Sequence, residues 1–297
     1  MPLLATNALS KRYPNGVLAL DALTVDVEPG VIGLVGANGA GKSTLIKILL
    51  GLLPPTAGSA SVLDFDPDQQ GERVRAVVGY MPEHDCLPSD VSATEFVVHM
   101  SRMSGLPLNA ARERAAEALR LVGLHEERYR QIGGYSTGMK QRVKLAQSIV
   151  HDPQLLLLDE PTNGLDPAGR NDMLGLIRRI GSEFGISILV SSHLLSEIEL
   201  ICDSLIVIDG GKLLRHDTLA AFTERREVLL VQVDEGIDEL AAALATTGLQ
   251  FSRDGDGLLV PLDGDEAYDV IRDTVAELRL PLHRLEQRRH RVEEVFR

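Results

Sequence analysis

The stretch "VIGLVGANGAGKSTLIKILLG", residues 31–51, decides the fold. A short apolar run comes first, a glycine-rich loop follows, and the chain then continues into a segment with helical apolar spacing. The loop "GANGAGKST" matches the pattern G-x-x-x-x-G-K-[ST] between a strand and a helix, the context that this phosphate-binding motif requires. Gly36, Gly39 and Gly41 let the backbone approach phosphate oxygens closely, so that successive N–H groups can meet their charge.

The other residues of this loop supply the polar side chains that a bound nucleotide needs. Lys42 can reach the outer phosphates, and the hydroxyl of Ser43 can be a ligand of Mg²⁺. We therefore expect nucleotide phosphates to bind at Gly36, Asn38, Gly39, Ala40, Gly41, Lys42, Ser43 and Thr44. A glycine-rich turn that arises by chance is the alternative, and the strand–loop–helix context counts against it.

A second stretch, "LLLLDEPTNGLDP" at residues 155–167, supplies acidic residues. An acid at the end of a buried strand near a phosphate loop can hold Mg²⁺, and Asp159 fits that position. Glu160 follows it, where a base could orient or deprotonate a water molecule. Two acids at a strand end can also cap the next segment, but the phosphate loop in the same chain favours the catalytic interpretation.

Short apolar runs between helical stretches indicate the organisation of the first three-quarters of the chain. They occupy residues 31–35, 155–159, 186–192 and 204–209. Such runs are typical of strands buried on both faces, which predicts an α/β fold with a parallel sheet. From about 85 to 150 the pattern is helical, and "SATE" at 92–95 reads as a capping box. We expect one domain over residues 1–225, with a helical subdomain inserted at about 85–150.

The pattern changes after residue 225. A strand, a helix, a hairpin with the glycine-rich turn "DGDG", a second helix and a last strand follow one another. This βαββαβ order predicts a small α+β domain of the ferredoxin-like plan over residues 226–297. The "DGDG" turn lacks the ligand spacing of a calcium loop, so we interpret it as a turn only.

Composition narrows the possible functions. The 297-residue chain is 44% hydrophobic and 25% charged, as ordinary globular proteins are. Its net charge of −13 argues against sequence-independent binding of nucleic acid. Cys86 and Cys202 are far apart, which fits a reducing cytosol. We expect no targeting signal in the first residues, "MPLLATNALSKRY". The apolar runs are too short to cross a bilayer, so we expect any membrane role to be peripheral.

The stretch "GYSTGMKQRVKLAQSI", residues 134–149, places small residues before a basic amphipathic helix. Free N–H groups at such an uncrowded helix start can bind an anion, for example a phosphate. Ser136 could instead simply cap its own helix. The residues alone leave both interpretations open.

Taken together, residues 3–225 resemble the ATP-binding cassette (ABC) transporter ATPases. The phosphate loop, "GYMPE", "YSTGMKQR", "LLLLDEP", "GLD" and "SSHLLSE" occur in the order of that family. The resemblance implies an α/β P-loop cassette that binds and hydrolyses ATP with Mg²⁺. It places "YSTGMKQR" at the family's signature, usually written LSGGQ, which contacts ATP held by a second subunit. It therefore implies a homodimer in which Ser136, Thr137 and Gly138 act in trans.

The resemblance also assigns roles to single residues. Tyr13 matches the aromatic residue on which adenine stacks, although a tyrosine near a chain start is more often a packing residue. Asp166 matches the acid at the dimer interface, and it could also cap the next helix. His193 matches the histidine that senses the γ-phosphate and belongs to the catalytic set with Glu160.

Two features depart from the family pattern. Glu83 stands where the family has a glutamine that reaches Mg²⁺; a carboxylate can also be a metal ligand, but it adds negative charge beside a triphosphate. Thr137 and Met139 replace the usual glycine and glutamine of the signature. We expect Ser43, Asp159 and Glu83 to be the protein ligands of the metal.

The motif variants and the ending "VEEVF" resemble the ATPases of ABC-2-type exporters, often linked to efflux of drugs, antibiotics or sodium. This implies a separate transmembrane permease as partner and a place in the cytoplasm on the inner face of the membrane. The alternatives are a soluble cassette ATPase acting on DNA or ribosomes, and a nucleotide-binding regulator without hydrolysis. Lys42, Asp159 and Glu160 argue against the regulator.

Overall fold

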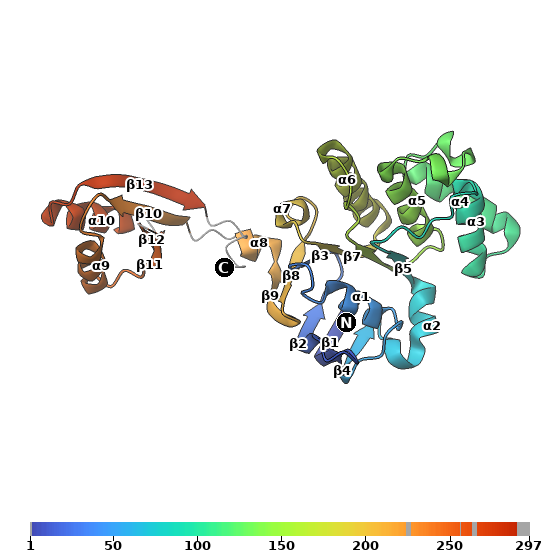
Figure 1. Ribbon diagram of the computed structural model, residues 1–297, viewed down its shortest axis with the longest axis horizontal. Coiled ribbons are helices and arrows are strands. Elements are labelled where there is room, and N and C mark those ends of the chain that lie inside the picture. The colour runs from blue at the N-terminus through green and yellow to red at the C-terminus, as the bar shows by residue number, and fades with distance from the viewer. Residues whose placement is uncertain (1, 224–226, 256, 263–265, 290–297) are drawn as a thin grey trace. The chain divides into compact units, whose positions relative to one another are not determined.

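The computed structural model of the protein describes residues 2–223, 227–255, 257–262 and 266–289, and it consists of two compact units. The first unit comprises Met1–Leu219 and the second Ala220–Arg297. Figure 1 shows the elements of each unit, which are described separately below. The predicted boundary between residues 225 and 226 and the "VEEVF" ending both lie outside the described residues. That boundary stays a prediction.

A six-stranded sheet forms the centre of the first unit. Its strands follow the order β5 (Val78–Met81), β6 (Leu155–Asp159), β7 (Ser187–Ser192), β3 (Val31–Val35), β8 (Ser204–Asp209) and β9 (Lys212–Thr218). The first five are parallel, and β9 pairs with β8 in antiparallel fashion. All residues of β3, β6 and β7 are buried, which explains their continuous apolar sequence. The four predicted strands are confirmed; β5 and β9 were not predicted.

A second, antiparallel sheet had no clear sequence signal. It contains β2 (Leu18–Val27), β1 (Leu4–Arg12) and β4 (Ala57–Val62), in that order. The register between β1 and β2 shifts near Ala8 and Ala22, and both residues have positive φ. Such bulges break the regular alternation of buried and exposed residues by which a strand is recognised. Helix α1 (Lys42–Leu49) contacts strands of both sheets, so the phosphate loop at its start is held by a common core.

Helices cover the rest of the first unit. They are α2 (Pro67–Val77), α3 (Ala93–Met103), α4 (Leu108–Leu121), α5 (Thr137–Ile149), α6 (Pro167–Phe184) and the short α7 (Leu195–Ile198). Helices α3, α4 and α5 contact one another and lie together in Figure 1, within the range predicted as helical. The predicted capping box is present, because Ser92 Oγ accepts from the Glu95 N–H and the Glu95 carboxylate accepts from the Ser92 N–H.

The second unit shows the predicted βαββαβ order. Its elements are β10 (Glu227–Val233), α9 (Ile237–Thr246), β11 (Ser252–Asp254), β12 (Gly257–Leu262), α10 (Glu266–Glu277) and β13 (Leu282–Arg289), after the short α8 (Leu219–Thr223). The strands form an antiparallel sheet in the order β11-β12-β10-β13, which is the arrangement of the ferredoxin-like plan. Leu229, Val231 and Val260 from the sheet pack with Leu240 and Ile271 from the helices in one core.

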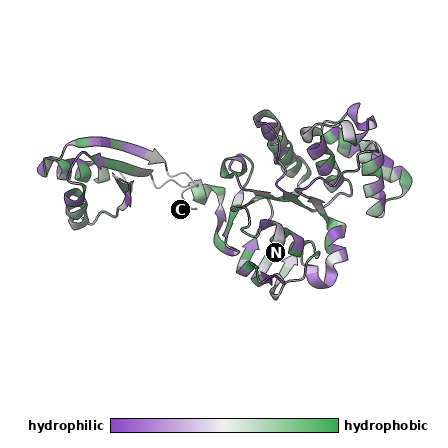
Figure 2. Ribbon diagram, in the orientation of Figure 1, coloured by the Kyte–Doolittle hydropathy of each residue, from purple (hydrophilic) through white to green (hydrophobic). Residues whose placement is uncertain are grey.

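The surface helices are amphipathic. Figure 2 shows hydrophilic and hydrophobic residues alternating around the surface helices, while hydrophobic residues dominate the inner strands of the first unit. Across the described ranges of the chain, no helix combines the length and apolar character that a membrane crossing needs.

Candidate functional site

The phosphate loop joins β3 to α1 and depends on glycines at two points of close approach. Gly41 caps α1 in the left-handed conformation, with φ of 107°, and a Cβ atom there would lie 2.4 Å from the carbonyl oxygen of Ala19. At Gly36 a Cβ atom would lie 2.4 Å from the carbonyl oxygen of Ile208. Only glycine fits at either place, so the loop presents bare backbone N–H groups at the start of a helix.

Lys42 lies at the centre of the site. Its ammonium group donates to the carbonyl oxygens of Gly36 at 2.7 Å and Ala37 at 3.3 Å, so it folds back over the loop. It also forms an ion pair with Glu160, with Nζ and Oε1 3.5 Å apart and both side chains 7% exposed. The Glu160 Oε1 atom is buried and accepts no hydrogen bond from the described residues. This pair therefore joins the phosphate loop to the end of β6.

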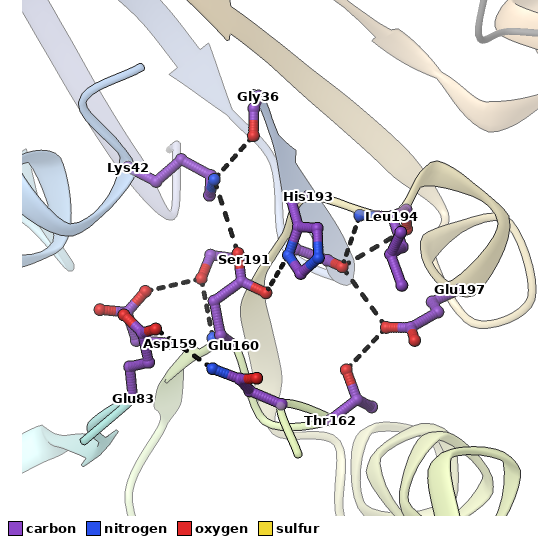
Figure 3. A network of polar contacts seen from close by, with 12 residues as sticks. Gly36, Lys42, Glu83, Asp159, Glu160, Thr162, Ser191, His193, Leu194 and Glu197 are labelled. Carbon is purple, nitrogen blue, oxygen red and sulfur yellow. Dashed lines mark hydrogen bonds and ion pairs between the residues drawn. The ribbon is translucent and has the colours of Figure 1, made fainter. Parts of the chain in front are cut away.

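Glu160 is held in a strained backbone conformation by its neighbour Ser191. Its φ is 48°, which lies in the left-handed region of backbone conformation. This region is energetically unfavourable for any residue that has a side chain. The Ser191 hydroxyl accepts from the Glu160 N–H at 3.0 Å and donates to Asp159 Oδ1 at 2.7 Å. Figure 3 shows this single buried hydroxyl between the two acids. Ser191 therefore fixes both carboxyl-bearing residues at once.

Two further side chains contact this group from different elements. His193, after β7, places Nδ1 2.9 Å from Glu160 Oε2, and its side chain is 42% exposed. Glu83, after β5, accepts at Oε1 from Asn163 Nδ2 at 3.2 Å. Asn163 was not predicted, because its role depends on a contact between residues that lie 80 positions apart.

These residues line one cavity of about 520 Å³. Its lining comprises Val17, Ala19, Asn38, Gly39, Gly41, Lys42, Ser43, Thr44, Glu83, Glu160, Asn163 and His193. Most of the predicted phosphate-binding residues and both predicted catalytic residues thus face a common space. Asp159 is 3% exposed and lies beside it at the end of β6, while Gly36 and Ala40 are buried in the loop beneath.

Tyr13 is half-buried beside the phosphate helix. Its hydroxyl lies 3.2 Å from Thr44 Oγ1, and the Lys11 ammonium is 5.9 Å from the centre of its ring. Tyr13 itself is not among the described residues that line the cavity, although Val17 and Ala19 from the same region are. Its expected stacking on adenine stays a prediction.

The signature residues lie outside the cavity of their own chain. Ser136 caps α5 by accepting from the Met139 N–H at 3.3 Å, and its contact with an anion stays a prediction. Ser136 and Thr137 are exposed, and Gly138 is half-buried. Asp166 is also exposed and caps α6 by accepting from the Gly169 N–H at 3.0 Å. None of these four predicted residues lines the cavity described above.

A buried carboxylate that the sequence did not single out braces the loop after β6. Glu197 Oε2 accepts from Thr162 Oγ1 at 2.6 Å and from Ser192 Oγ at 3.4 Å. Its other oxygen lies 3.6 Å from the Arg170 guanidinium. Figure 3 shows the contact between Thr162 and Glu197 near His193. The "SSHLLSE" stretch contained both Ser191 and Glu197, but only the fold shows what they contact.

Several known proteins are similar to this chain. Residues 20–163 match the model of the family described as ABC transporter. The chain is 33% identical to the uncharacterized ABC transporter ATP-binding protein YdbJ of Bacillus subtilis (strain 168), over 93% of this chain and 86% of the relative. It is 38% identical to the daunorubicin/doxorubicin resistance ATP-binding protein DrrA of Streptomyces peucetius, over 72% of this chain and 64% of the relative. It is 37% identical to the bacitracin transport ATP-binding protein BcrA of Bacillus licheniformis, over 72% of this chain and 69% of the relative.

Solved structures show the same fold. The cbiO1 protein of Clostridium perfringens, described as part of the ABC transporter complex cbiONQ, superposes with a TM-score of 0.69 at 27% identity, over 83% of this chain and 97% of that one. The dimeric ATP-binding cassette MJ0796 bound to ADP and Pi superposes with a TM-score of 0.67 at 22% identity, over 73% of this chain and 98% of that one. The predicted cassette fold is confirmed. The chain belongs to the ATP-binding proteins of ABC transporters, and it is an ATPase of that family.

Proposed function

We propose that this chain is the ATP-hydrolysing subunit of an exporter, and that two copies drive a separate ABC-2-type permease from the inner face of the membrane. The observation that carries the hydrolytic part is the convergence of Lys42, Glu160 and His193 on one cavity above the phosphate loop. The exporter part rests on the relatives, whose names include daunorubicin/doxorubicin resistance, bacitracin transport and linearmycin resistance.

In this proposal the phosphate loop binds the triphosphate. Backbone N–H groups at the start of α1 meet the phosphate oxygens, and the helix dipole favours their negative charge. Lys42, which contacts Glu160 at 3.5 Å, also faces the cavity and can turn its ammonium group to the outer phosphates. A phosphate there would replace the carboxylate as the partner of Lys42, and Glu160 would become free to accept a proton.

Glu160 then acts as the base. Its carboxylate faces the cavity, its backbone is fixed by Ser191, and His193 Nδ1 holds Oε2. A water between Glu160 and the outer phosphate would be oriented by the carboxylate and lose a proton to it as its oxygen attacks the γ-phosphorus. The bond between that phosphorus and the oxygen bridging to the β-phosphate breaks in the same step, and ADP leaves with the electron pair. His193 lines the same space, so its imidazole orients Glu160 and lies where it can contact the γ-phosphate.

The residues present fit Mg²⁺. Ser43, Asp159 and Glu83 offer a hydroxyl and two carboxylates, hard oxygen ligands of the kind this ion prefers. Among the described residues no group of three or more His, Cys, Asp and Glu side chains could hold a metal alone, so phosphate oxygens and water would complete its ligands. When bound, Mg²⁺ neutralises charge that develops on the β- and γ-phosphates.

The proposed dimer follows from the position of the signature. Ser136 and Thr137 are exposed and lie outside their own cavity, at the start of a helix whose N–H groups can meet an anion. In a head-to-tail pair they, with Gly138, would complete the cavity of the partner copy, and Asp166 would lie at the interface. Such an arrangement makes hydrolysis depend on dimer formation.

The substitution Glu160→Gln tests the hydrolytic part. We expect it to keep ATP binding, because the amide is isosteric and Lys42 remains, and to lower turnover by at least about a hundredfold, the usual contribution of a general base. ATP binding is measured with a fluorescent nucleotide and turnover by phosphate release. Glu183→Gln, at an exposed residue of α6, is the control with unchanged turnover. Undiminished hydrolysis in Glu160→Gln would refute the assigned base.

The exporter part has its own test. A tagged chain is purified in mild detergent from membranes of its host, and the proteins that accompany it are identified. A multi-span protein present in near-equal amount, which raises ATP turnover, is the expected result. Recovery of the chain with ribosomes or DNA factors, and without a membrane protein, would refute the transport role and leave the ATPase assignment intact.

A further inference from the structure

One face of α5 carries polar side chains that hold the backbone of β5 and of the loop after it. We call Lys140, Lys144 and Gln147 the α5 polar row; their spacing of four and three residues places them on the same side of the helix. Gln147 Nε2 donates to the Tyr80 carbonyl oxygen at 3.3 Å, and Lys140 forms an ion pair with Asp85 at 2.9 Å. The row thus runs alongside the segment that contains Glu83.

Lys144 is the centre of this row. It is 3% exposed, and its ammonium group donates to the carbonyl oxygens of Pro82 at 2.7 Å, Glu83 at 2.9 Å and His84 at 3.5 Å. An ammonium group has three N–H donors, so three converging carbonyl groups satisfy it. Burying a charge is costly without such partners, and an apolar residue at this position would avoid that cost.

The charge of Lys144 also acts on the site. Burial lowers the pKa of Lys144, and the nearby Cys86, Asp85, Glu83 and Asp159 oppose this shift by favouring the charged form. The ammonium group of Lys144 contacts the backbone of Glu83, one of the proposed metal ligands. It offsets part of the repulsion that a carboxylate at position 83 brings beside a triphosphate.

The side chain of Glu83 is held from the same helix by a second route. Its Oε1 accepts from Asn163 Nδ2 at 3.2 Å, and the Asn163 carbonyl oxygen accepts from Gln141 Nε2 at 3.0 Å. Gln141 is 5% exposed and belongs to α5. One helix thus fixes the backbone of Glu83 directly and its carboxylate through one intermediate residue.

We infer that Lys144 is a positioning residue of the ATPase site, which fixes the backbone of residues 82–84 so that the Glu83 carboxylate faces the cavity. The inference rests on the metal role of Glu83 in the proposed function. Lys144 does not line the cavity and touches no reacting atom; it acts through Glu83. Because Ser136 caps the helix that contains Lys144, a movement of α5 would shift both the proposed trans contact and the loop that contains Glu83.

The test combines a structural and a catalytic measurement on Lys144→Met, which keeps an unbranched side chain only one atom shorter and removes its donors. We expect backbone amides of residues 83–87 to exchange with deuterium at least about tenfold faster, because the loop loses the hydrogen bonds that hold it. We also expect the Mg²⁺ concentration for half-maximal ATP turnover to rise about tenfold. Gln147→Leu is the matched control: it removes one bond to β5 but leaves residues 82–84 held.

A double-mutant cycle with Glu83→Ala separates the possible causes. If Lys144 acts through Glu83, adding Lys144→Met to Glu83→Ala leaves the Mg²⁺ requirement unchanged. An equal effect of Lys144→Met in both backgrounds would overturn the inference, and so would wild-type amide exchange in Lys144→Met. Should that variant fail to fold, Lys144→Gln is expected to give intermediate exchange, and wild-type exchange in it would overturn the inference equally.

The same cycle distinguishes this inference from the proposed function. A Glu83→Ala variant with the wild-type Mg²⁺ requirement would refute the metal role of Glu83. In that event the amide exchange of Lys144→Met still decides whether the lysine fixes the loop. Glu160→Gln, in turn, tests hydrolysis without touching either residue.

Discussion

Replacing Ser191 by alanine should destabilise the first unit and slow hydrolysis together. The hydroxyl donates to the Asp159 carboxylate at 2.7 Å and accepts from the Glu160 N–H at 3.0 Å, and Ser191 is fully buried. Losing the charge-assisted bond and leaving the N–H without a partner costs about 3 to 5 kcal/mol. Each kcal/mol lowers the unfolding temperature of a unit of this size by about 2 to 4 °C, so Tm should fall by about 6 to 20 °C.

The measurement is thermal unfolding beside phosphate release, on Ser191→Ala and on the control Ser187→Ala. Ser187 begins the same strand and is buried, but its described contacts use the backbone only. We expect the control to change Tm by less than about 2 °C. We also expect kcat of Ser191→Ala to fall about tenfold, because Glu160 loses the bond that holds its strained backbone. A Tm within about 2 °C of the wild type would refute the role assigned to Ser191.

Two further outcomes are expected. Gly41→Ala should lose more stability than Gly39→Ala and bind ATP at least about a hundredfold more weakly. Both glycines have positive φ, but only a Cβ atom at Gly41 would meet a backbone carbonyl oxygen, at 2.4 Å. Unfolding temperatures and nucleotide titration measure the two effects, and equal losses in the two variants would contradict the expectation. Burial lowers the pKa of His151, so the folded state disfavours protonation. The contribution of His151 to the free energy of unfolding is therefore fully present above its unfolded pKa of about 6.5. This contribution decreases as the pH falls below that value, by at most about 1.4 kcal/mol at pH 5.5. His151→Gln should unfold with a smaller pH dependence between about pH 7.5 and 5.5, and an unchanged dependence would contradict this cause.

The sequence predicted those parts of the site whose chemistry is contiguous in the chain. The phosphate loop, Asp159 and Glu160 lie at strand ends, and the parallel order of the strands brings these ends to one edge of the sheet. The capping box at Ser92 and the βαββαβ order were predicted for the same reason, because neighbouring residues determine them. Local rules were sufficient wherever the interacting groups were neighbours.

The remaining features depend on contacts between distant residues. Ser191 bonds to groups more than 30 positions away, and Lys144 to carbonyl groups about 60 positions away, so neither role is visible in a window of sequence. Glu160 adopts a positive φ although nothing in its residue type favours it. Strand β1 escaped detection because bulges interrupt its alternation. Each of these features is determined by tertiary contacts and not by the local conformational propensity of the residues.

Strand β5 is an edge strand of the main sheet, and side chains from α5 and the residues just after it cover that edge. A marginal strand with free carbonyl groups is a template on which a strand of another molecule can assemble. Here the carbonyl groups of Val78, Tyr80 and Pro82 already accept hydrogen bonds from side chains that follow one another along and just beyond α5. Until that helix docks, a newly made chain exposes this template. Docking of α5 therefore protects the β5 edge from pairing with a strand of another molecule, and it also orders the site.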